Sequence, residues 1–236
     1  MVALSVSKVI KPSSSSITSP TDTITSITST SPSSPISGTA TSTSSPAEDA
    51  EGLEDAEDVL FGFEYGLSDE LTVGISRTKG AGELSALVSP SIKYRILHQK
   101  DDNSMPLSLT LMGVSTISTM KSSQSEALTN FDKFAHRISY TAQILIAHKF
   151  SQRFTLQVMP GYTHRNKVDF NDVNGIFSVG VGTRIQINKV FGIIADATFL
   201  LADRPDGFYT PMGIGLEIDT GGHIFQLNFT NATGII

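Results

Sequence analysis

The chain has 236 residues, with 17 Lys and Arg against 23 Asp and Glu, and it has no cysteine. This acidic balance disfavours a nucleic-acid-binding protein, because contacts from Lys and Arg to phosphates dominate that affinity. The lack of cysteine excludes disulfide scaffolds, thiolate zinc sites and cysteine nucleophiles.

The chain starts with a segment that we predict to be disordered, residues 1–57. Residues 11–46 are mostly Ser and Thr with scattered Pro, and residues 48–58 are strongly acidic. Neither stretch has enough apolar side chains to offset the entropy lost on folding. A Ser/Thr-rich stalk is the functional alternative. The first ten residues lack the long apolar run and the small-residue cleavage site of a secretory signal.

Residues 58–236 are predicted to form one all-β domain of about ten strands, bounded by Gly, Asn, Asp, Ser or Pro. The longest apolar run, near residues 144–147, is far shorter than the roughly 20 residues of a membrane helix. Tight turns alternate with longer polar loops, which is typical of an antiparallel up-and-down transmembrane β-barrel. The predicted strands are residues 59–66, 70–78, 87–98, 106–118, 136–149, 153–165, 174–188, 191–202, 211–219 and 222–230.

Apolar and polar side chains alternate along most of these strands. In the strand 153–165, for example, Phe154 and Leu156 share one face, whereas Thr155 and Gln157 share the other. A soluble sandwich shows the same alternation, with its apolar face inside. The polar face here carries few Lys or Glu of the kind that coat the edges of soluble sheets, and this favours a polar lumen.

The charged side chains of the polar face are predicted to form a network in that lumen. Acidic residues, Glu64 among them, could pair there with arginines across a narrow interior. The residues predicted to form the network are Arg95, Arg137, Arg184, Asp196 and Glu217.

Aromatic residues near the strand ends suit the interfacial girdles of a membrane barrel. The general preference of aromatic residues for strands explains them equally well. These residues are Tyr65, Tyr140, Phe150, Phe154, Tyr162, Phe191 and Tyr209.

The number of predicted strands bears on closure of the barrel. If the short turns are periplasmic, the first predicted strand runs toward the periplasm and the tenth runs away from it. Single-chain outer-membrane barrels have an even number of strands and keep their ends in the periplasm, so at least one more strand is expected at each end, about twelve in all. On this argument the chain is a barrel fragment, truncated at both ends.

Four segments resemble a known family. They are LFGFEYGLSDELTVGISRT, IKYRIL, HRISYTAQILIAHKFSQRFTLQVMPGYTHRN and TGGHIFQLNFTNATGI. In this order they resemble the DUF5777-type outer-membrane β-barrel proteins of Bacteroidetes, a family of unknown function, over residues of about 60–235. The resemblance implies a barrel in the outer membrane and supplies no catalytic residues. Members begin with a signal peptide and further strands and end with another strand, so this chain departs from them at both ends.

No residue pattern points to catalysis, to a cofactor or to a metal. The five histidines form no HxH or HExxH spacing. His148 and His164 are expected on the apolar face, where the serines are scattered and not in the register that a hydrolase requires. We therefore expect no catalytic, cofactor-binding or metal-binding residues.

The sequence thus predicts a non-enzymatic outer-membrane β-barrel, serving as a structural barrel or a narrow pore. Its expected partners are the lipid bilayer of the outer membrane and, for a complete barrel, the barrel-assembly machinery. Nucleic acid is not expected, and the sequence indicates no particular small solute. A soluble β-sandwich or lipocalin-like module that binds a small ligand is the alternative. A third reading is a gene fragment that never inserts into a membrane.

Overall fold

The computed structural model describes most of the chain from residue 59 onward and one short N-terminal segment. The described residues are 2–8, 59–79, 86–100, 102, 104–122, 130–168, 173–201, 210–220 and 223–231.

Eleven strands and one short 3₁₀ helix form the described part of the chain. They are β1 (Val2–Lys8), β2 (Val59–Gly66), β3 (Leu71–Lys79), β4 (Ala86–Leu97), β5 (Ser108–Ser118), η1 (Phe134–Arg137), β6 (Ile138–Lys149), β7 (Phe154–Arg165), β8 (Gly175–Gln186), β9 (Phe191–Leu200), β10 (Met212–Asp219) and β11 (His223–Thr230). Among the described residues, no helix is long and apolar enough to cross a membrane.

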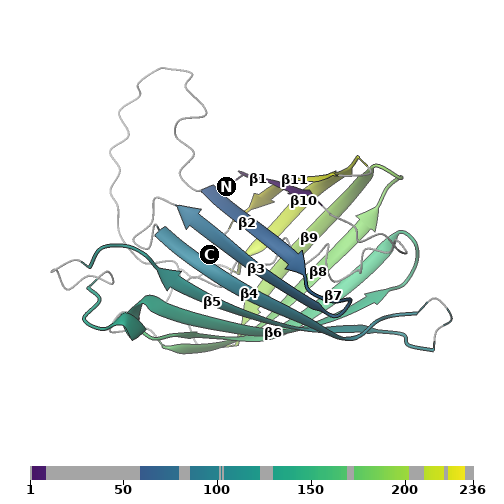
Figure 1. The fold of residues 1–236 in the computed structure, drawn as a ribbon. Helices are drawn as coiled ribbons and strands as arrows, with labels where there is room; N and C mark the ends of the chain where they lie inside the picture. Colours follow the sequence, from purple (N-terminus) through teal and green to yellow (C-terminus); the bar gives the residue numbers. More distant parts are fainter. Residues whose placement is uncertain are drawn as a thin grey trace, which may run out of the picture.

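All eleven strands belong to one antiparallel sheet (Figure 1). From β2 to β11 each strand pairs with the next along the chain, and β1 adds to the far side of β11. The ten strands predicted from the sequence correspond to β2–β11, with ends that differ by no more than two residues. The up-and-down all-β fold is therefore confirmed.

The strand β1 is a difference from the sequence prediction, because it lies within residues 1–57, which were expected to be disordered. Its sequence, VALSVSK, alternates Val and Leu with Ala and Ser, as a strand does. The edge of β11 supplies the hydrogen-bonding partner, from Val2 opposite Phe229 to Lys8 opposite His223. This stretch is too short to stand out from the Ser/Thr-rich sequence that follows it. The rest of residues 1–57 lies outside the described part.

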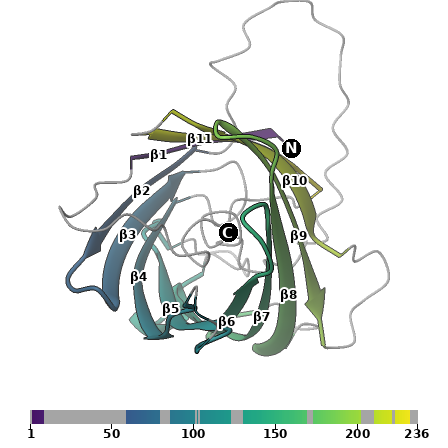
Figure 2. The same ribbon diagram turned by 90° about the vertical axis from the view of Figure 1, so that its right-hand side faces the viewer.

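The sheet curls so that its two edge strands, β1 and β2, come to the same side of an open barrel (Figure 2). Among the described residues no pairing joins these two edges. Because β1 is antiparallel to β11 and ten strands alternate from β2 to β11, β1 runs parallel to β2. All-antiparallel closure needs an even number of strands. The expectation of about twelve strands stays a prediction.

The distribution of apolar and polar side chains between the two faces of the sheet is the reverse of that in a soluble protein. Large apolar side chains point outward into solvent, for example Phe63, which is 76% exposed, and Phe177, which is 62% exposed. Polar side chains on the inner face are buried, among them those of Gln157 and Glu217. A soluble sandwich would bury the apolar face, since the hydrophobic effect drives such side chains out of water. The outer face is instead suited to lipid.

Short connections gather at one end of the sheet, which we call the short-turn rim. Three of these turns share one design, in which a side-chain oxygen accepts hydrogen bonds from the backbone amides two and three residues later. The oxygens belong to Ser68, Ser151 and Asn188. In the β4–β5 connection, the hydroxyl and amide of Ser104 donate to Asp102 at 2.7 and 3.0 Å. These bonds lower the pKa of the Asp102 carboxyl.

The strands β3, β5, β7 and β9, which lead into the longer connections, end at the opposite side of the sheet, which we call the long-loop rim. The aromatic residues expected in the girdles are all exposed where the structure describes them, with Tyr65 and Phe191 near the short-turn rim and Tyr140 and Tyr162 toward the long-loop rim. Tyr209 lies outside the described residues. The assignment of these residues to interfacial girdles stays a prediction.

Candidate functional site

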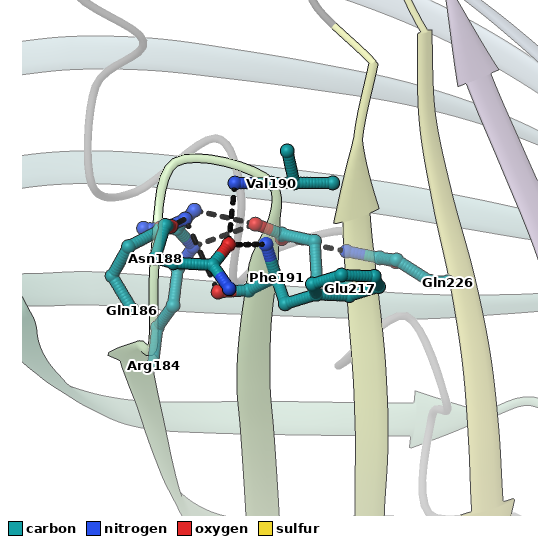
Figure 3. A network of polar contacts seen from close by, with 7 residues as sticks. All are labelled: Arg184, Gln186, Asn188, Val190, Phe191, Glu217 and Gln226. Atoms are coloured by element: carbon teal, nitrogen blue, oxygen red, sulfur yellow. Dashed lines mark hydrogen bonds and ion pairs between the residues drawn. The ribbon is translucent and has the colours of Figure 1, made fainter.

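The best-defined polar cluster on the inner face joins β8, β10 and β11 close to the short-turn rim (Figure 3). Nε and Nη2 of Arg184 donate to Oε1 of Glu217 at 2.9 and 2.5 Å. Nε2 of Gln226 donates to Oε2 of the same carboxylate at 3.3 Å. The Glu217 side chain is 1% exposed and the Arg184 side chain 23% exposed, so both oxygens of a buried carboxylate have partners.

This ion pair passes over a glycine on the strand between its two members. Arg184 lies on β8 and Glu217 on β10, and Gly192 on β9 is the direct neighbour of Glu217. A Cβ atom on Gly192 would lie 3.5 Å from Oε1 of Glu217. The two charged side chains therefore meet above the backbone of β9, where a larger residue would stand between them.

A second ion pair has the same design at the other side of the sheet. Nζ of Lys93 on β4 donates to both carboxylate oxygens of Glu64 on β2, at 2.7 and 2.9 Å. Gly74 on β3 lies between them, and a Cβ atom there would lie 3.1 Å from Cγ of Glu64. This pair is more open, because the side chain of Glu64 is 54% exposed. The two pairs thus differ mainly in burial.

The structure brings together two of the five residues predicted to form the lumen network, Arg184 and Glu217. It places the other three elsewhere. Arg95 donates to the backbone carbonyl of Asp69 in the β2–β3 turn. Arg137 donates to the carbonyls of Ser118 and Met120 near the long-loop rim, and its guanidinium lies over a phenylalanine ring.

Asp196, the remaining member, is half-buried in the middle of β9 and has no hydrogen-bonding or ionic partner in the described part of the chain. Its Oδ1 would lie 2.8 Å from a Cβ atom on Gly213. The described contacts therefore join two of the five residues, Arg184 and Glu217, and the wider network stays a prediction. Side-chain alternation identifies the face of a charge but not its height along the barrel, and height decides which charges meet.

Three participants were missed in the sequence, namely Lys93, Gln226 and the spacer glycine Gly192. The signal for Lys93 was present, because it shares the polar face of its strand with Arg95. The role of Gly192 depends on the register between β9 and β10, which a single sequence does not reveal.

Several side chains in the middle of the inner face are inaccessible to solvent. Leu145 and Met159 are 1% and 0% exposed, and they form an apolar cluster with Met112 on the inner wall of β5–β7. Gln157 on β7 is also fully buried, and neither its Oε1 nor its Nε2 has a hydrogen-bond partner. Within the described ranges, no group of three or more His, Asp or Glu is placed to hold a metal ion.

Filling the gap at Gly192 is expected to weaken the buried ion pair. A Gly192→Leu substitution puts a side chain between Arg184 and Glu217, and overpacking of this kind typically costs about 1–3 kcal/mol. Gly192→Ala is the matched control, because a Cβ atom at 3.5 Å makes an ordinary contact. The measurement is the free energy of unfolding in urea after reconstitution into lipid vesicles. Equal stability of the two variants would contradict the proposed route of the ion pair.

Comparison with known proteins gives one family match. The model of DUF5777, described as a membrane-bound beta barrel domain, matches residues 36–236. The match begins ahead of the domain boundary predicted at residue 58. No curated protein matches the chain.

Proposed function

Because the chain belongs to the DUF5777 family of membrane-bound β-barrel domains, we propose that it is a non-enzymatic barrel of a bacterial outer membrane. A barrel of β-strands can cross a membrane because every backbone amide and carbonyl finds a partner in the sheet. Barrels of the up-and-down type with alternating short turns and long loops are typical of outer membranes. The short-turn rim would then face the periplasm and the long-loop rim the exterior.

The observation that carries this proposal is the exposure of the outer face. Nearly every outward position from β3 to β11 is apolar, aromatic, Gly or Pro, and many of these side chains are more than a third exposed. In water a surface of this extent would drive aggregation. In a bilayer the same surface contacts the acyl chains. The soluble β-sandwich alternative loses its support here, since it needs the apolar face to be the buried one.

We further propose that the barrel has a structural or scaffolding role and is not a constitutively open pore. The support is the burial of inner-face side chains, since Leu145, Gln157 and Met159 are inaccessible to solvent. A barrel of about a dozen strands is small enough for side chains to occupy much of its lumen. The narrow pore remains the competing role.

Fractionation and conductance test the two parts of this proposal separately. The expressed full chain is expected to require detergent for extraction and to migrate faster in SDS before heating than after it. The purified protein in planar bilayers is expected to give no steady conductance. Recovery of the folded chain in the aqueous fraction would overturn the membrane assignment, whereas steady ion currents would overturn only the closed interior.

A further inference from the structure

The outer face of the described strands carries very few charged side chains. Side chains that alternate outward on β2–β11 are apolar or aromatic, with a few Gly, Pro, Ser, Thr and His among them. Only two of these outward positions carry Lys, Arg, Asp or Glu, counting the part of the sheet whose side chains the structure describes. Both charges are positive and both lie on β3: Arg77 and Lys79.

These two cations sit side by side at the end of β3 that meets the long-loop rim. They are two residues apart on one strand and therefore project from the same face. Register places Arg77 between Phe61 of β2 and Val88 of β4, and it places Lys79 beside Ala86. Both are exposed, and so is Phe61, at 69%. The two charges thus stand directly at the border of the apolar outer face.

Neither cation has a hydrogen-bonding or ionic partner among the described residues. Two cations of the inner face differ in this respect, since Lys93 pairs with Glu64 and Arg184 pairs with Glu217. A charge on a lipid-facing surface is costly unless it reaches the headgroup region or meets an opposite charge. Within the described part of the chain, nothing compensates these two charges.

We propose that Arg77 and Lys79 bind the phosphate of an anionic lipid headgroup at the rim of the barrel. The guanidinium of Arg77 can donate hydrogen bonds to two phosphate oxygens at once, and the ammonium of Lys79 adds a second positive charge. The continuity of the pair with the apolar outer face favours a lipid over a soluble anion, because acyl chains would cover Phe61 and Ile75 while the headgroup meets the cations. This inference rests on the proposed insertion of the barrel into a membrane.

The test compares lipid binding by the detergent-solubilised full chain and by two double variants. In Arg77→Gln/Lys79→Gln both cations of the proposed site are removed. In Arg153→Gln/Lys189→Gln, the matched control, the same charge is removed from exposed positions at the short-turn rim. Native mass spectrometry measures the affinity for phosphatidylglycerol and for phosphatidylcholine, with inorganic phosphate as a competitor. A heat-dependent shift in SDS verifies that each variant is folded.

The native chain is expected to prefer phosphatidylglycerol, and millimolar phosphate is not expected to displace it. Loss of both cations should weaken phosphatidylglycerol binding by roughly 25-fold, from about fivefold for each Lys or Arg near an anionic surface. The control should stay within about twofold of the native chain. Equal binding by the folded Arg77→Gln/Lys79→Gln variant, or full displacement by phosphate, would overturn the lipid site alone. A native chain that needs no detergent would overturn the membrane assignment together with this site.

Discussion

Replacing Glu217 with alanine is expected to lower the free energy of unfolding by about 3 kcal/mol, because it leaves the Arg184 guanidinium without its buried partner. The carboxylate is 1% exposed and accepts hydrogen bonds from both Arg184 and Gln226, so water cannot readily replace it. Urea unfolding of the reconstituted protein measures the effect.

Glu64→Ala is the matched control for this experiment. It removes the same chemical group from the other ion pair, but the Glu64 side chain is 54% exposed. Exposed pairs contribute up to about 1 kcal/mol, and the loss should be correspondingly small. If the two variants lost equal stability, burial would not be what separates the two pairs.

A lysine in the middle of the outer face is expected to be nearly as disruptive. Val181 lies near the centre of β8 and points outward between Val158 and Ala197. In a bilayer, Val181→Lys should cost about 2–4 kcal/mol, whereas Ile185→Lys, on the same strand and face but near the short-turn rim, should cost up to about 1 kcal/mol. Unfolding of both variants in lipid vesicles measures the difference.

The dependence on depth is what distinguishes a lipid-facing surface from a soluble core. In a soluble sandwich both positions would pack against a second sheet, and a lysine would cost similar amounts at each. Equal losses for the two variants would therefore argue against a bilayer around the strands.

Much of the fold follows from sequence alone because its dominant signal is local. Alternation with a period of two identified all ten strands from β2 to β11 and separated the apolar from the polar face along most of them, as Phe154 and Thr155 illustrate. Turn chemistry located the connections, since Ser151 and Asn188 close their turns through their own side chains. The strand β1 was not predicted, because its place in the sheet depends on pairing with β11, more than 200 residues away in the sequence.

The sequence predicted which face of the sheet carries the polar cluster, but not which of its charged residues are in contact. Arg184 and Glu217 were correctly placed on one face, but the same reasoning placed Arg137 with them, and that residue lies near the opposite rim. Which charges meet is set by strand register and by small spacers such as Gly192. The alternation of side chains along one strand reveals neither the register between strands nor the position of a spacer residue.

The central claim is that the apolar face of the sheet contacts lipid, and collision rates of spin labels on β8 test it most directly. The chain has no cysteine, so Phe177→Cys, Ser178→Cys and Val179→Cys each provide a single labelling site without further changes. In reconstituted vesicles, labels at 177 and 179 are predicted to collide often with oxygen and rarely with a water-soluble nickel chelate, and the label at 178 should show much lower oxygen collision. Low oxygen access at 177 and 179 together with high access at 178 would contradict the account.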